Sequence, residues 1–461
     1  MRGGYGYGTT REKRLPPASV RLIREPHVKS IGSILVIVAV VCLFLISPHA
    51  LAYSILAHEA IIDSAWDKIR ALLLERFPSA TPEELLQAKS YAHGGCLIQD
   101  LGYYPHGNRF YSDLTHYVRS GDFIEALLRD AQDLDEYAFA LGALAHYAAD
   151  SNGHEAVNRA VPLLYPKLAR KHGNIVTYED DPAAHLRTEF GFDVLQVAKG
   201  RYAPDAYHDF IGFEVADSLL QRAFQDTYCI PLGLVFDNLD RAIGSYRYAI
   251  RSIVPRAARV AWVLKKDEIQ QGTPGITRNK FLYHMSRASY RKEWGKNYDT
   301  PGTGTRILAS IVWLLPKVGP LKALSLRVPT PTAELMFREG FNKAIEQYET
   351  LLDDERTGRL DLRDRNLDTG DQTEPGAYFM ADQAYANLLN DLAKYDFYFT
   401  SVNLKLNILA YYEDPGAPII TKKNTKAWDR LSKQLKVLKS AALVNSENVF
   451  LSLGEAAKSS F

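Results

Sequence analysis

The chain has 461 residues, of which 46% are hydrophobic and 24% charged, a composition typical of a globular protein with enough residues for a large core. The formal net charge of +1 excludes a broad electrostatic attraction to nucleic acid or to an anionic membrane, although a local site for either remains open. The three cysteines form no CxxC pair, which argues against a thiolate metal site. Cys96 and Cys229 either pair in an exported chain or remain free thiols.

The N-terminus has two parts. Residues 1–30 are rich in Lys and Arg, and residues 31–47 form an uncharged apolar run that ends shortly before Ala50 and Ala52. This order predicts that residues 1–52 are a basic n-region followed by a signal peptide cleaved after Ala52, or else a signal anchor that is kept. We therefore expect an exported protein that is periplasmic or secreted, or is held at a membrane by residues 31–47.

From Tyr53 onward, apolar residues recur at three- and four-residue steps, which predicts an all-α fold. We expect Thr81 and Ser120 to cap helices, and Gly153 to end or distort a helix just before His154. The predicted helices cover residues 58–77, 81–95, 120–131, 134–157 and 183–200.

Residues 210–461 also have a helical pattern, with breaks that include 327–332, 367–377 and 413–418. Pro316 and Pro320 argue against a membrane-spanning helix over the apolar residues 306–326, which fit a buried hairpin or a membrane-facing surface. The chain contains no P-loop or dinucleotide-binding glycine motif.

His146, Asp150 and His154 lie four residues apart, so they share one face of a predicted helix. His185 and Glu189 form a second pair with the same spacing, which is able to hold one metal ion on a single helical turn.

Three further residues are candidates for the same centre. We expect His116 to project from a loop and Asp100 to lie near a glycine-rich turn. His58 follows five residues after Tyr53, which is the expected first residue of the cleaved chain. Nitrogen and oxygen ligands without thiolates favour zinc over manganese or iron.

In its order of His, Asp, His-Tyr, His-x-x-x-Asp-x-x-x-His and His-x-x-x-Glu, this pattern resembles the zinc-dependent phospholipase C family. The superfamily includes the fungal single-strand-specific zinc nucleases. The helix with His-x-Ala-Ala-Asp is most similar to the catalytic domain of glycosylphosphatidylinositol-specific phospholipase D. Two features differ from the family pattern, a tyrosine in place of the usual N-terminal tryptophan and a short step from Asp150 to His154.

The resemblance implies a multi-helix bundle with three zinc ions in a cleft, followed here by a helical C-terminal extension. One zinc would be held by Asp100, His116, His146 and Asp150. Asp150 would bridge to a second zinc, held also by His58 and by the amine and carbonyl of Tyr53. The third would be held by His154, His185 and Glu189. Asp100 would orient or deprotonate the attacking water, with the metal ions neutralising the phosphodiester.

The resulting hypothesis is an exported zinc-dependent phosphodiesterase of phospholipase C type that acts on phospholipids or lipid-linked phosphodiesters and contacts a membrane surface. The alternatives are a single-strand nuclease, the only one of these functions with a nucleic acid partner, and a zinc-binding protein without turnover that binds a membrane or a partner. No protein partner is predicted. We expect the catalytic domain over residues 53–209, with residues 210–461 either completing the same fold or serving another role.

Overall fold

The computed structural model describes residues 55–104, 106–198, 213–248 and 327–441, with a few residues between 266 and 277. Every regular element within these ranges is a helix, so the predicted all-α class is confirmed, and the one strand-like pairing there is an isolated bridge between Arg365 and Gln372. In chain order the helices are α2 (Ile55–Arg76), α3 (Pro82–Gly95), η1 (Ile98–Tyr103), α4 (Arg109–Tyr117), α5 (Ser120–Asp130), α6 (Leu134–Leu164), α7 (Pro166–His172), α8 (Pro182–Ala198), α10 (Asp217–Tyr228), α11 (Leu232–Val235), α12 (Leu239–Tyr248), α17 (Pro331–Arg356), α18 (Phe379–Ala393), α19 (Val402–Tyr411), η5 (Ile420–Lys423) and α20 (Thr425–Ser440).

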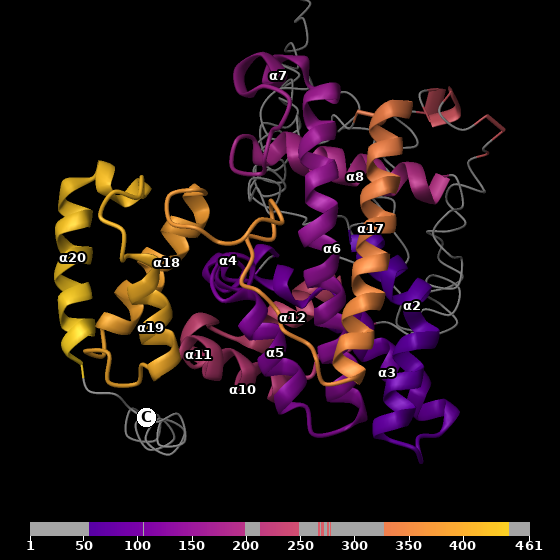
Figure 1. Ribbon diagram of the computed structural model, residues 1–461. Coiled ribbons are helices and arrows are strands. Elements are labelled where there is room, and N and C mark those ends of the chain that lie inside the picture. The colour runs from indigo at the N-terminus through magenta and orange to yellow at the C-terminus, as the bar shows by residue number, and fades with distance from the viewer. Residues whose placement is uncertain are drawn as a thin grey trace, which may run out of the picture. The chain divides into compact units, whose positions relative to one another are not determined.

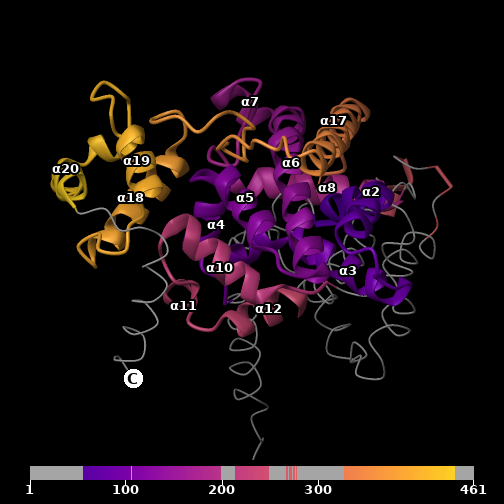
Figure 2. The ribbon, with the colours of Figure 1, turned by 60° about the horizontal axis from the view of Figure 1, so that its bottom comes forward.

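Helix α6 is the central element around which the others pack. Its residues are apolar on nearly every side, a pattern that requires neighbours all around the helix. Helices α2, α3, α5, α8 and α17 supply them, and Figures 1 and 2 both show α17 running alongside α6. The predicted metal-binding stripe of α6 is therefore deeply buried.

Two glycines allow α3 and α6 to approach closely. A Cβ atom on Gly142 would overlap the carbonyl oxygen of Ala92, and one on Gly95 would overlap the carbonyl oxygen of Phe139. Both obstacles are backbone atoms, which cannot rotate away as a side chain can. The crossing also fixes the start of the segment that leads to Asp100.

We expect Gly142→Ala to lower the free energy of unfolding by about 3 kcal/mol, because the added methyl group must push the two helices apart. The matched control is Gly244→Ala in α12, where an added Cβ meets no described atom within 4 Å. There the higher helix propensity of alanine should raise stability by up to about 1 kcal/mol. Urea denaturation gives the free energy of unfolding of each variant. Equal values for the two variants would show that α3 and α6 do not approach as closely as described.

The predicted helix caps have different outcomes. The Thr81 hydroxyl accepts a hydrogen bond from the Glu84 amide (3.2 Å) and the Glu84 carboxylate accepts one from the Thr81 amide (2.8 Å), which confirms the cap of α3. The predicted Ser120 cap is wrong, since Ser120 is the first residue of α5 and follows Arg119 in a left-handed conformation (φ 51°). The Ser120 hydroxyl instead donates to the Arg365 carbonyl at 2.7 Å and accepts from its amide at 2.8 Å.

The prediction that Gly153 ends its helix is also wrong, because α6 continues to Leu164. Gly153 lies where α17 crosses α6. A Cβ atom on Gly340 of α17 would lie 2.8 Å from the Ala156 Cβ and 3.7 Å from the Gly153 Cα. Small residues at this crossing permit close packing, and the unbroken helix keeps His154 in register with the residues one turn before it.

The C-terminal part contains α18, α19 and α20, which pack on one another, and α18 also contacts α4. The breaks predicted at 367–377 and 413–418 fall between helices, whereas the break at 327–332 overlaps the first turn of α17. The segment 357–378 connects α17 to α18, and its residue Leu367 is hydrogen-bonded to His116 and His154.

Several predictions concern residues outside the described ranges, namely Tyr53, the apolar run 31–47 and residues 306–326. Among the described helices, none combines the length and the apolar character needed to span a membrane. Cys96 and Cys229 are both buried free thiols, so the alternative in which they pair is wrong.

Candidate metal centre

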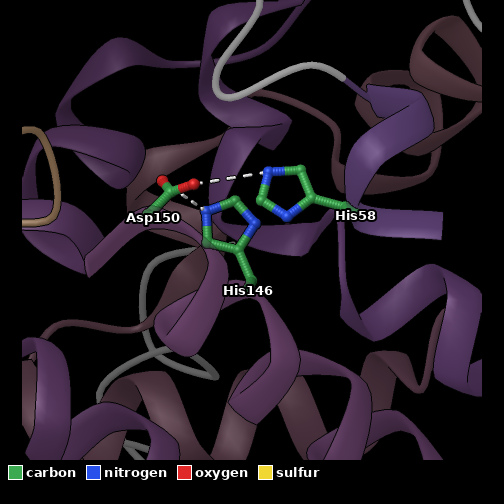
Figure 3. A group of neighbouring side chains, drawn as sticks. All are labelled: His58, His146 and Asp150. Carbon is green, nitrogen blue, oxygen red and sulfur yellow. Dashed lines mark ion pairs between the residues drawn. The ribbon is translucent and has the colours of Figure 1, made fainter. Parts of the chain in front are cut away.

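The carboxylate of Asp150 lies among histidines from three helices. Its Oδ1 is 3.4 Å from Nε2 of His58, and its Oδ2 is 3.1 Å from Nε2 of His146 and 3.6 Å from Nε2 of His116. Figure 3 shows the His58 ring, from α2, and the His146 ring, from α6, beside this carboxylate. The two rings stack with centroids 4.3 Å apart, and all four side chains are buried.

A second group shares His146 with the first. Asp100 in η1 has its Oδ1 3.4 Å from Nε2 of His116, and ligand atoms of Asp100, His116 and His146 lie within 4.8 Å of one another. The prediction that His116 projects from a loop is wrong, because His116 lies in the last turn of α4. The Asn108 side chain accepts a hydrogen bond from the Phe110 amide at 3.0 Å and so starts this helix before the histidine.

The third group joins α6 to α8. Glu189 Oε1 is 2.9 Å from Nε2 of His185 and 3.2 Å from Nε2 of His154. His154 Nε2 is also 3.9 Å from Asp150 Oδ1, so the third group lies next to the first. The structure thus brings together eight of the nine residues predicted from the sequence, and the ninth, Tyr53, lies outside the described residues.

Backbone carbonyls orient three of the imidazoles. Nδ1 of His116 is 2.8 Å from the Ser112 carbonyl oxygen, Nδ1 of His146 is 2.9 Å from that of Cys96, and Nδ1 of His154 is 2.9 Å from that of Leu367. A carbonyl oxygen only accepts, so Nδ1 carries the proton in each ring. Each Nε2 then faces the carboxylates and is the ring nitrogen available to a metal ion, as in a metal-ligating histidine.

The two aspartates have opposite electrostatic environments. Burial alone would raise the pKa of the Asp150 carboxyl. The charges of His146 and His154 have the larger, opposite effect, so the net pKa lies well below the usual range. Burial raises the pKa of the Asp100 carboxyl above its usual value, against the opposing effect of His116. Asp150 is therefore a permanent anion, whereas Asp100 accepts a proton more readily.

The histidines also differ. Burial, reinforced by His146, holds the pKa of His58 well below its usual value. Burial lowers the pKa of His116 too, but the neighbouring carboxylates of Asp100 and Asp150 raise it more, so its net pKa lies well above the usual value. The pKa of His154 is raised to about 10, because the charges of Asp150 and Glu189 outweigh the effect of burial.

These residues fit a group of divalent cations. Several of their ligand atoms are buried without a hydrogen bond to any described residue: both carboxylate oxygens of Asp100 and of Asp150, Nε2 of His116 and of His146, and Oε2 of Glu189. Buried polar atoms without partners cost free energy, which bound cations offset. A donor set of imidazoles and carboxylates suits zinc.

Sequence reasoning missed the contribution of the segment 357–378. Leu367 supplies the carbonyl that orients His154, and Asp368 Oδ1 lies 3.6 Å from the same ring nitrogen. Both residues lie in a stretch whose sequence predicts only a break between helices. The stretch carries no motif of its own. Its partners in α6 are more than 200 positions away in the sequence, so no local pattern indicates that it contacts the centre.

Comparison with known families agrees with the geometry. Residues 57–238 match the model of a family described as zinc dependent phospholipase C, which confirms the resemblance inferred from the sequence. The match contains all eight residues of the three groups. Comparisons with curated proteins and with solved structures give no match.

Proposed function

We infer that this chain, which carries a zinc-dependent phospholipase C-like phosphodiester hydrolase over residues 57–238, hydrolyses phospholipids or lipid-linked phosphodiesters. One observation carries the proposal: three groups of buried histidines and carboxylates lie within the segment that matches the family. A purely structural core has little use for so many ionisable side chains, and ligand atoms of Asp100, Asp150, His116 and His146 lack a hydrogen bond to any described residue.

We assign the eight described residues to three zinc ions. The first would be held by Asp100, His116, His146 and Asp150, and Asp150 would be shared with a second held by His58 and the N-terminal Tyr53. The third would be held by His154, His185 and Glu189. When bound, zinc supplies Lewis-acid chemistry, which neutralises a phosphodiester anion and makes water a better nucleophile at neutral pH.

The protein's own residues supply proton handling and rigidity. Asp100 is the proposed base, since burial raises the pKa of its carboxyl, and both of its oxygens lack a hydrogen bond to any described residue. Asp150, whose pKa is held low, stays ionised and supplies fixed negative charge. The products would be a phosphomonoester and an alcohol.

The proposal is tested with three substrates, each with and without a zinc chelator: a chromogenic phosphocholine ester, fluorescent phosphatidylcholine and single-stranded DNA. We expect hydrolysis of the lipid substrates that the chelator abolishes and zinc restores. Cleavage of DNA alone would support the nuclease alternative. Bound zinc without turnover of any phosphodiester would support a binding protein, and purified protein without zinc would contradict the whole assignment.

We also propose that the chain is exported and that its signal segment is removed after Ala52. This proposal rests on the basic residues 1–30, the apolar run 31–47 and the small residues that follow. Cleavage there would expose the amine of Tyr53 five residues before His58. N-terminal sequencing of the mature protein tests the proposal, and a start at Met1 would contradict it.

Helix α20 is the proposed membrane-contacting surface. Leu431 and Leu438 are buried, whereas the exposed side of α20 carries five cations and a single anion, Asp429. The cations are Lys426, Arg430, Lys433, Lys436 and Lys439. Basic residues clustered on an amphipathic helix attract anionic lipid, by about 1 kcal/mol for each residue near the surface.

We expect the triple variant Lys426→Glu, Arg430→Glu and Lys433→Glu to lose at least tenfold in affinity for vesicles that contain anionic phospholipid. The matched control replaces three exposed cations of α7 with Glu and so changes the net charge by the same amount. These cations are Lys167, Arg170 and Lys171. Cosedimentation with vesicles measures binding. A control that binds as weakly as the α20 variant would show that only the net charge matters.

A further inference from the structure

The segment 357–378 contacts the metal centre through its backbone, although it lies outside the 57–238 family match. The Leu367 carbonyl accepts a hydrogen bond from Nδ1 of His154 at 2.9 Å, and the Leu367 amide donates to the carbonyl of His116 at 3.0 Å. One residue of this segment thus touches ligands from two of the three groups.

A glycine turn presses the segment against α6. The Gly370 amide donates to the Asn366 carbonyl at 2.8 Å, and Gly370 has a φ of 78°, a conformation that favours glycine. A Cβ atom at this position would overlap the carbonyl oxygen of Ser151, the residue after Asp150. The turn therefore sets how closely the segment approaches the face of α6 that carries the ligands.

The carboxylate of Asp368 is held at the centre of this contact. Its Oδ2 accepts hydrogen bonds from the hydroxyls of Tyr117 (2.8 Å) and Tyr378 (2.6 Å), and its side chain is only 6% exposed. Burial and the Asp368 charge raise the pKa of both phenols well above the usual value, so both remain donors. The Asp368 backbone carbonyl accepts from the Asn158 side chain at 2.8 Å, which anchors the same residue to α6.

The other oxygen, Oδ1, faces Nδ1 of His154 at 3.6 Å, on the side of the ring away from Glu189. A carboxylate charge beside the N–H of an imidazole makes the opposite nitrogen a stronger ligand. The two tyrosines keep Asp368 from rotating away, while the Leu367 carbonyl accepts the hydrogen bond from Nδ1–H of His154.

We propose that Asp368 is a positioning residue for the metal ion held by His154, His185 and Glu189, and that the segment 357–378 is part of the catalytic unit. The proposal rests on the function proposed above and adds a residue that the family match does not contain. Asp368 acts through His154 and touches neither the metal ion nor the substrate.

The test compares full-length Asp368→Asn with Asp371→Asn, the same change at an exposed position three residues along the segment. Zinc content is followed by mass spectrometry during titration with a competing chelator. We expect Asp368→Asn to bind one zinc at least tenfold more weakly and to keep the others at wild-type affinity. In the cobalt-substituted protein, the visible spectrum should change in Asp368→Asn and stay unchanged in Asp371→Asn.

A merely structural role would lower the melting temperature and leave every zinc affinity unchanged, and that result would overturn the proposal. If Asp368→Asn fails to fold, Tyr378→Phe removes one hydrogen bond from the carboxylate and should weaken the same zinc severalfold. Unchanged zinc affinity in a folded Tyr378→Phe would then also overturn it. Wild-type protein that binds no zinc would contradict the proposed function itself, whereas failure of the variants alone leaves that function standing.

Discussion

Replacing Asp150 with Asn is expected to remove both zinc binding and turnover. Nε2 atoms of His58, His116 and His146 lie within 3.1–3.6 Å of the Asp150 carboxylate, and that of His154 lies 3.9 Å away. An amide keeps the shape but loses the charge that would bridge two cations. We expect hydrolysis of phosphatidylcholine to fall at least about a thousandfold, a loss of roughly 4 kcal/mol of transition-state stabilisation.

The matched control is Asp135→Asn in the first turn of the same helix. Its carboxylate accepts a hydrogen bond from the Gln87 side chain at 2.6 Å, near the surface and away from the metal centre. This variant should retain wild-type zinc content and activity. Zinc is measured on both purified proteins beside the hydrolysis rate, and an Asp150→Asn protein that keeps its turnover would falsify the assigned centre.

The sequence predicted the ligands of α6 and α8 well because helical spacing alone places them. His146, Asp150 and His154 recur every four residues, as do His185 and Glu189, and any helix brings such residues to one face. The apolar residues around them also predicted burial. These predictions required only local periodicity, the strongest structural signal in a single sequence.

Two predictions failed because their outcome depended on tertiary contacts. Gly153 suggested a helix end, yet it serves the crossing with Gly340 of α17, far away in the sequence. Ser120 is a residue type that often caps helices, yet its hydroxyl forms hydrogen bonds with the backbone of Arg365. In both cases a distant segment supplied the contact that decided the role of the residue.

Asp368 was unpredictable for the same reason. Its neighbours in sequence are typical of a turn, and its significance comes from Tyr117, Tyr378 and His154, which only the folded chain brings together. The position of the ligands could be inferred from local pattern, whereas the residues that orient the ligands could not. The same division is expected wherever a metal centre is built on helices and supported by a loop from elsewhere in the chain.

Zinc uptake by the metal-free protein is expected to release at least two protons per chain at pH 7. The carboxylates around His116 raise its pKa well above the usual value, and those around His154 raise its pKa to about 10, so both rings are protonated at neutral pH without metal. Each must lose its Nε2 proton to bind zinc. Raising the pH toward these pKa values weakens that competition, so the apparent affinity of the zinc held by His116 and that of the zinc held by His154 should each rise about tenfold per pH unit between pH 6 and 8.

His58 should contribute no proton, since burial keeps its pKa well below the usual value and its ring is already neutral at pH 7. Calorimetric titration with zinc in two buffers of different ionisation enthalpy gives the proton count directly. His172→Gln is the control, because His172 pairs with Asp180 at 2.9 Å outside the centre and its replacement should leave the count unchanged. A zinc affinity that does not vary with pH over this range would mean that the carboxylates do not hold these imidazoles protonated before the metal arrives.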